Sequence, residues 1–159
     1  MSERKPAAIL RAADQAAKGG TFSHPYNPRS EIVGTPLSRA TGLSKAAVNL
    51  ARIQPGKESF VLHAHHYEEE WIYILEGEGM VISGEETHRV GPGDFVAFPV
   101  PSLPHHLRND GPEELVYLMG GENRPFDVVD FPEQGKLGVK TPDGFKVFDA
   151  ANAKGRGEL

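Results

Sequence analysis

Short apolar runs bounded by turn residues dominate the middle of this chain and constrain its fold more than any other feature. The runs span residues 46–54, 59–65, 70–76, 79–83, 86–90, 94–98, 105–109 and 115–120. Turn pairs such as Pro55-Gly56 and Asp110-Gly111 separate them, and the 18 Gly and 13 Pro in 159 residues are too many for a helix bundle. Strand-length runs at hairpin spacing are typical of antiparallel sandwiches and barrels. We therefore predict an all-β fold.

The segments on either side of the predicted barrel, residues 46–121, have a different character. Residues 1–45 begin with an Ala-rich stretch at 7–18, which predicts a short helix, and continue as an extended arm with Pro and Gly turns. Residues 122–159 carry short apolar pieces between turns, and we expect them to form a C-terminal tail packed on the barrel. The sequence shows no internal repeat, so we expect one domain.

Composition and charge exclude several classes of function. The chain has no cysteine, so any metal ion must be bound by histidine and carboxylate side chains. The formal net charge is −5 and no basic stripe stands out, which argues against a nucleic-acid partner. Arg11, Asp14 and Lys18 interrupt the N-terminal segment, which therefore fits neither a signal peptide nor a membrane span. We expect a cytoplasmic protein without a membrane partner.

Five of the seven histidines lie in two groups, at 63–66 and 105–106. A single strand histidine is more often a surface or core residue than a metal ligand, so the grouping carries the argument. Side chains alternate between the faces of a strand, so we expect His63 and His65 on one face with Cβ atoms about 7 Å apart, which suits two ligands of one ion. Glu70 begins the next strand and could lie beside this pair. His105, at the start of a later strand, could complete a set of three imidazoles and one carboxylate.

Two spaced motifs resemble the two signatures of the cupin family. The first motif comprises Gly56, His63, Ala64, His65, Glu70 and Gly77, and the second comprises Gly93, Pro99, His105 and Asn109. The resemblance covers residues 56–109 in the motifs and about 46–120 with the flanking strands. It implies a double-stranded β-helix, which is a small jelly-roll barrel, with the N-terminal helix and arm and the C-terminal tail added to it.

The chain departs from the family pattern in three places. One extra residue separates Gly56 from His63, Pro101 stands where the second motif has glycine, and one extra residue precedes His105. A slip of one residue in that loop would turn His106 inward in place of His105. We expect His105 to face the barrel interior, because Asn109 keeps the family spacing from it.

The resemblance implies that one divalent metal ion is bound in the mouth of the barrel by His63, His65, Glu70 and His105. Such a donor set suits Fe, Mn, Ni, Cu or Zn. Strand alternation places further apolar side chains on the same inner faces as these ligands, where they would contact a small-molecule substrate. They are Val61, Ile72, Ile74 and Leu107.

The resemblance favours a metal-dependent enzyme that acts on a small oxygenated molecule. Small cupins include isomerases of sugars and sugar phosphates, in which a metal holds carbonyl and hydroxyl oxygens while a nearby carboxylate or histidine moves a proton. This implies a catalytic role for Glu70. An Fe-dependent dioxygenase is an alternative, because the apolar pocket has no obvious phosphate clamp. A barrel that binds a small molecule without chemistry is a further alternative.

Aromatic residues outside the motifs add a prediction about assembly. Trp71 and Tyr73 alternate out of phase with Glu70 and are expected on the outer face of the barrel. Together with the long arm before residue 46, they predict a homodimer. Tyr67, Tyr117 and Met119 could line the mouth of the barrel, although packing in the core is the more common role of such residues.

Overall fold

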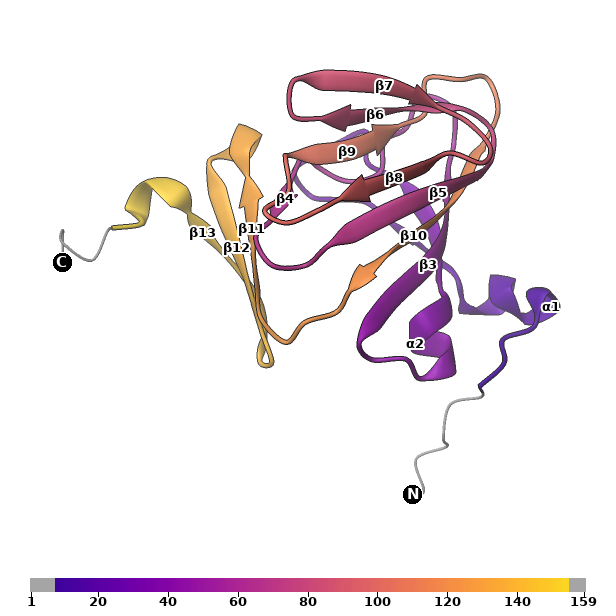
Figure 1. Cartoon of the computed structure of the whole chain (residues 1–159), viewed down its shortest axis with the longest axis horizontal. Helices are drawn as coiled ribbons and strands as arrows, with labels where there is room; N and C mark the ends of the chain where they lie inside the picture. The colour runs from indigo at the N-terminus through magenta and orange to yellow at the C-terminus, as the bar shows by residue number, and fades with distance from the viewer. Residues whose placement is uncertain (1–7, 155–159) are drawn as a thin grey trace.

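Antiparallel sheets form the walls of a barrel in the computed structural model, which describes residues 8–154 (Figure 1). The larger wall is a six-stranded sheet in the order β1-β2-β3-β10-β5-β8. Its strands are β1 (Gly20–Phe22), β2 (Ile32–Pro36), β3 (Ala46–Ile53), β10 (Leu115–Glu122), β5 (Glu70–Glu76) and β8 (Phe95–Phe98). The long pairings of β10 with β3 and with β5 form the centre of this sheet.

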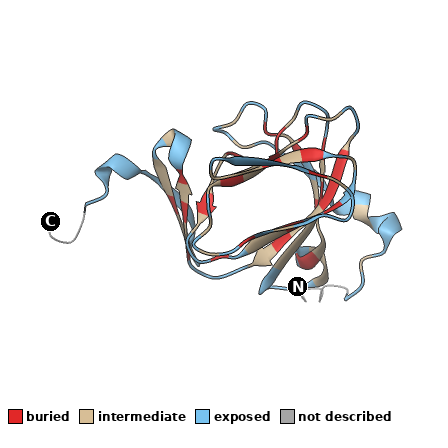
Figure 2. Cartoon of the chain, turned by 45° about the horizontal axis from the view of Figure 1, so that its top comes forward, coloured by how far each residue is buried: buried red, intermediate tan, exposed pale blue. Residues whose placement is uncertain are grey.

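A three-stranded sheet, β7-β6-β9, forms the opposite wall, and a four-stranded sheet, β13-β12-β11-β4, adjoins the barrel (Figure 2). Their strands are β7 (Glu86–Val90), β6 (Gly79–Ser83), β9 (His105–Arg108), β13 (Gly144–Asp149), β12 (Lys136–Thr141), β11 (Asp127–Phe131) and β4 (Ala64–His65). The helical segments are α1 (Ala12–Gln15), η1 (Ala16–Lys18), α2 (Leu37–Thr41), η2 (Pro132–Gln134) and η3 (Ala150–Asn152). In the described part of the chain, no helix is long and apolar enough to cross a membrane. The all-β antiparallel fold predicted from the sequence is confirmed.

Alternation along the strands puts apolar side chains inside the barrel. In β5, Ile72 and Ile74 are buried, whereas Tyr73 between them is exposed. The main core cluster takes residues from both walls, among them Ile53, Ile74, Val81, Leu107, Leu115 and Tyr117. Full burial of a large aliphatic side chain contributes roughly 1.5–3 kcal/mol. This shared core therefore holds the two walls together.

Among the barrel strands, the one predicted over 59–65 differs most from the structure. Only Ala64–His65 forms a ladder, and it pairs with β11 and not with a barrel strand. The rest of the segment meets β9 at separate points, where Ser59 donates its backbone N–H to the carbonyl of Leu107 and His63 forms an isolated bridge with His105. Strict alternation of side chains fails in this segment because it lacks a continuous ladder.

Both ends of the chain contain strands that were not expected. The predicted helix at 7–18 is found at Ala12–Lys18, and residue 7 lies outside the described residues. The arm then adds β1 and β2 to the edge of the large sheet. The C-terminal segment, predicted as a packed tail, forms β11, β12 and β13, which extend away from the barrel on its β4 side (Figure 1).

Gly77 begins the turn between β5 and β6, and a substitution of this residue tests how tightly this end of the barrel is packed. Its φ is +75°, and a Cβ there would lie 2.3 Å from the carbonyl oxygen of Glu114. Gly56 is a matched control, because its φ is +79° and no atom lies within 4 Å of its Cβ position. We expect Gly56→Ala to lower the free energy of unfolding by about 1 kcal/mol and Gly77→Ala by roughly 3 kcal/mol, measured by denaturant titration. Equal losses would contradict the steric explanation.

Candidate metal centre

Three histidine side chains converge on the carboxylate of Glu70 inside the barrel. The Nε2 atoms of His105, His65 and His63 lie 3.2, 3.3 and 3.6 Å from Glu70 Oε2. The four residues come from different places: Glu70 from the start of β5, His105 from the start of β9, His65 from β4, and His63 from the bridge to His105. The structure therefore brings together all four residues that the sequence singled out as ligands.

The second nitrogen of each of these imidazoles has its own acceptor. Nδ1 of His63 lies 2.9 Å from the carbonyl oxygen of Val61, and Nδ1 of His105 lies 2.8 Å from that of Leu103. A carbonyl oxygen can only accept, so Nδ1 carries the proton in both rings. Each Nε2 therefore faces Glu70 and can bind a metal ion once it carries no proton, which is how metal-ligating histidines are commonly oriented.

His65 is oriented by Asp127, a residue that the sequence analysis did not single out. Asp127 Oδ2 lies 2.5 Å from His65 Nδ1, and its Oδ1 accepts the backbone N–H of Tyr67 at 3.0 Å. The side chain of Asp127 is fully buried. Its strand, β11, alternates buried and partly exposed residues, but Asp127 and His65 are 62 positions apart and nothing in the sequence indicated that they would meet.

The ring of His105 is also fixed by stacking. Phe98 lies parallel to it, with ring centroids 3.7 Å apart and an interplanar angle of 7°. Phe98 is on β8, next to Glu70 in the β5–β8 ladder. Glu70 and the ring of His105 are therefore held by the same pair of strands.

Burial and charge act in opposite directions on the ionisation of this cluster. Burial alone would lower the pKa of His65, but the hydrogen bonds and charges of Glu70 and Asp127 outweigh it and raise that pKa to about 9. Burial would likewise raise the pKa of Glu70, but hydrogen bonds with His105, His63 and His65 hold it well below its usual value. For His105, burial is the larger effect, and its pKa is lowered.

These residues fit a divalent cation. They provide three imidazole nitrogens and one carboxylate, and the His63, Glu70 and His105 donor atoms lie within 4.8 Å of one another. Without a cation, a proton on His65 balances the charge of Glu70, so the cluster already holds a positive charge where an ion would bind. The histidine and carboxylate donors suit Fe, Mn, Ni, Cu or Zn alike.

The structure resolves the choice between the two adjacent histidines of β9. The His105 side chain is 4% exposed and faces Glu70, whereas Nδ1 of His106 lies 3.8 Å from Glu58 Oε2 on the other face of the strand. Alternation keeps the two rings on opposite faces. The extra residue before His105 is therefore absorbed by the preceding loop.

A cavity opens beside the histidine cluster. Its empty volume is about 520 Å³, which includes the open solvent at its mouth. Besides His63, Glu70 and His105, its lining includes Asn49, Phe60, Ile72, Phe98, Leu107, Tyr117 and Met119. The sequence predicted an apolar cavity wall, and most of these side chains are apolar.

Two of the four predicted wall residues line the cavity and two do not. Ile72 and Leu107 are lining residues. Ile74 lies on the expected face but is fully buried in the core. Val61 packs with Val129 and Phe131 of β11, outside the cavity, because the segment before β4 is not a regular strand.

Binding of a divalent ion should release a proton from His65. With a pKa of about 9 this residue is protonated at pH 7, and its Nε2 must lose that proton to become a ligand. We expect about one proton released per ion at pH 7 and little release near pH 10, measured by calorimetry in two buffers of different ionisation enthalpy. Absence of proton release at pH 7 would contradict the charge balance described above.

Asp127→Asn should weaken metal binding, because one of the two carboxylate oxygens that hold His65 and the Tyr67 amide is replaced by an NH₂ group. Loss of such an orienting partner typically costs roughly 10–100-fold in affinity. Asp130→Asn is the matched control, since Asp130 lies on the same strand and holds the exposed His66 at 2.7 Å. Chelator competition with Zn²⁺ measures both constants, and equal effects of the two changes would refute a positioning role for Asp127.

Comparisons with known proteins agree with this geometry. The cupin domain family matches residues 49–121. A crystal structure from Acidithiobacillus ferrooxidans, named "Putative sugar phosphate isomerase", is 37% identical, with a TM-score of 0.87 over 93% of this chain and 96% of that chain. A sugar phosphate isomerase from a cupin superfamily, from Silicibacter pomeroyi, is 23% identical, with a TM-score of 0.77 over 89% of this chain and 92% of that chain, and shares the fold.

A curated relative also matches part of the chain. An uncharacterized protein of Methanocaldococcus jannaschii is 39% identical over 66 residues, which are 42% of this chain and 52% of that protein. The match thus spans about half the length of this relative. Together with the sequence motifs and the barrel, these similarities show that the chain belongs to the cupin family.

Proposed function

We propose that this cupin is a metal-dependent enzyme that isomerises a small oxygenated substrate of the sugar or sugar phosphate type. The observation that carries the proposal is the convergence of three imidazole Nε2 atoms on Glu70 Oε2 at the edge of a small-molecule cavity. The name of the 37% identical chain from A. ferrooxidans supports the same class of reaction.

The side chains of the site have separate roles in this proposal. His63, His65, His105 and Glu70 hold the ion, which when bound supplies Lewis-acid polarisation of substrate oxygens. Glu70 is the only carboxylate among the residues that line the cavity, and its lowered pKa keeps it ionised at neutral pH. It would accept the proton from the carbon next to the substrate carbonyl and return it to the carbonyl carbon, while the hydroxyl proton of that neighbouring carbon passes to the carbonyl oxygen. The apolar walls formed by Ile72, Phe98 and Met119 exclude bulk water from this exchange.

An Fe-dependent dioxygenase is the second candidate, and one observation favours it. None of the residues that line the cavity is lysine or arginine, so the cavity itself contains no side chain that would clamp a phosphate group. Arg52, a candidate phosphate handle by its position on β3, instead forms an ion pair with Glu114 at 2.8 Å. An apolar cavity next to a histidine and carboxylate cluster also suits oxygen chemistry.

Activity assays separate the two candidates. Protein loaded in turn with Mn²⁺, Zn²⁺, Ni²⁺ or Fe²⁺ should exchange aldoses and ketoses, free or phosphorylated, as followed by NMR. Glu70→Gln should lower that rate at least about 100-fold because it removes the base. Glu69→Gln, the exposed neighbouring residue, is the control and should leave the rate unchanged. No exchange with any ion, together with oxygen consumption by the Fe²⁺ form and a diol, would favour the dioxygenase.

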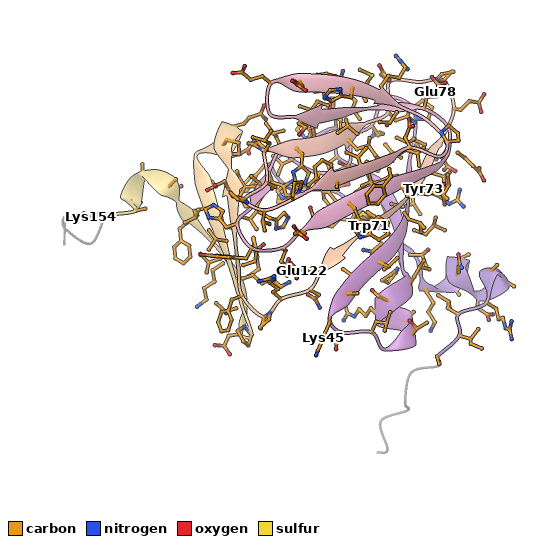
Figure 3. All side chains as sticks on the ribbon, viewed as in Figure 1. Lys45, Trp71, Tyr73, Glu78, Glu122 and Lys154 are labelled. Carbon is orange, nitrogen blue, oxygen red and sulfur yellow. The ribbon has the colours of Figure 1, made fainter. Side chains whose placement is uncertain are left out.

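We also propose that two copies of the chain pair through the outer face of the six-stranded sheet. Figure 3 shows Trp71 and Tyr73 on β5 at this face. Trp71 stacks on Phe95 with ring centroids 5.9 Å apart, and Phe95 is 61% exposed. Leu75 of β5 and Val33 of β2, in the same sheet, are also exposed. A cluster of large apolar side chains on one sheet face is typical of a protein interface.

Light scattering after size exclusion tests this arrangement at micromolar concentration. The unmodified chain should elute as a dimer, and Phe95→Glu should shift it to a monomer because a charge would be buried at the interface. Phe148→Glu, an exposed position on the C-terminal hairpin, is the control and should remain dimeric. A monomer before any substitution would refute the proposal.

A further inference from the structure

The hydroxyl group of Tyr117 is buried in the barrel without a hydrogen-bond partner. Its side chain is 1% exposed, and no described residue bonds to its Oη. Leaving a buried polar group unpaired is unfavourable, and native proteins usually give such a group a partner. Tyr117 also lines the cavity beside Glu70, so a molecule bound in the cavity can supply the missing partner.

Packing alone does not account for a tyrosine at this position. The residues paired with it on the neighbouring strands are Ala51 and Ile74, both fully buried and apolar. The surrounding core cluster is also built almost entirely of aliphatic and phenyl groups. A phenylalanine would fill the same volume without an unpaired hydroxyl, so the hydroxyl is the feature that needs a function.

Asn49 lies close to Tyr117 and adds a second polar group to the cavity. Met119 pairs with Asn49 on β3 and with Ile72 on β5, and Tyr117 is two residues before Met119 on the same face of β10. Asn49 and Tyr117 are thus diagonal neighbours, a relation that places Cα atoms roughly 7–8 Å apart. The Asn49 amide enters none of the side-chain hydrogen bonds among residues 8–154, although it lines the cavity.

We propose that Tyr117 and Asn49 form a neutral subsite that binds a hydroxyl or carbonyl oxygen of the substrate while another oxygen of the same molecule lies at the histidine cluster. The subsite extends the proposed isomerase function and rests on that function for the identity of the substrate. Burial, and to a smaller extent the charge of Glu70, raise the pKa of Tyr117, so its hydroxyl remains a donor at neutral pH.

The subsite restricts the chemistry of the part of the substrate that enters the barrel. Tyr117 and Asn49 carry no charge, and no lysine or arginine lines the cavity around them. Lys18 lines a more open hollow that shares Asn49, Phe60 and Met119 with the cavity. The substrate end in the barrel is therefore an uncharged, polyhydroxylated carbon chain, and a phosphate group would have to stay outside the cavity.

D-Glucitol binding to the Zn²⁺-loaded protein tests the subsite directly. This alditol has hydroxyl groups but no carbonyl, so binding is measured by saturation-transfer NMR without turnover. Tyr117→Phe should weaken its binding about tenfold, and Asn49→Leu should weaken it by a similar factor. Tyr73→Phe is the matched control, because Tyr73 lies on the outer face of the sheet. Equal binding by the unmodified protein and Tyr117→Phe, or binding by neither, would overturn the proposal.

Thermal unfolding of the metal-free protein gives a second, independent readout. Removal of an unpaired buried hydroxyl should leave the midpoint of Tyr117→Phe unchanged or raise it. A decrease of more than about 3 °C would show that the hydroxyl serves the fold and would overturn the subsite. If glucitol binding depends on Tyr117 but no aldose is isomerised, the proposed function fails and the subsite stands.

Discussion

The convergence of three imidazoles on the single carboxylate of Glu70 is the interaction on which the rest of the site depends. Glu70 starts β5, which lies between β10 and β8 in the large sheet, so its backbone is fixed on both sides. His105 comes from the opposite wall, and its bridge to His63 brings the third ring into reach. The barrel thus brings side chains from separate strands together around one carboxylate.

Each histidine of the cluster is oriented by an atom outside it. Backbone carbonyls orient His63 and His105, whereas a buried carboxylate from the C-terminal sheet orients His65. The β11 strand is held in place by its ladder with β4, which contains His65 itself. The C-terminal segment therefore does more than cover the barrel surface, because it supplies the carboxylate that orients His65.

The cavity combines a strongly polar wall with apolar walls. Nε2 atoms and the Glu70 carboxylate line one side, and Ile72, Leu107 and Met119 line much of the rest. In such surroundings an isolated polar group is expensive unless it is paired. Two of the polar groups away from the cluster, the Tyr117 hydroxyl and the Asn49 amide, are for this reason informative about the substrate.

Much of the fold and of the candidate site could be predicted from local sequence. The bounds of the strands beginning at Glu70, Gly79 and Glu86 follow from short apolar runs between turns, because strand period and turn chemistry are local properties. The four residues of the histidine cluster were predicted from the resemblance of two spaced motifs to the cupin signatures. The assignment of Val61 to the cavity was wrong, because alternation holds only where a continuous ladder enforces it.

The sequence by itself determined the all-β class, the cysteine-free donor set and the four residues of the cluster, since each depends on residue type and short spacing. Only the tertiary structure decided that Asp127 orients His65, that β1 and β2 extend the large sheet, and that the Tyr117 hydroxyl is unpaired beside the cavity. These features join residues that are far apart in the chain. Such contacts depend on how the walls pack, and no local pattern of side chains encodes them.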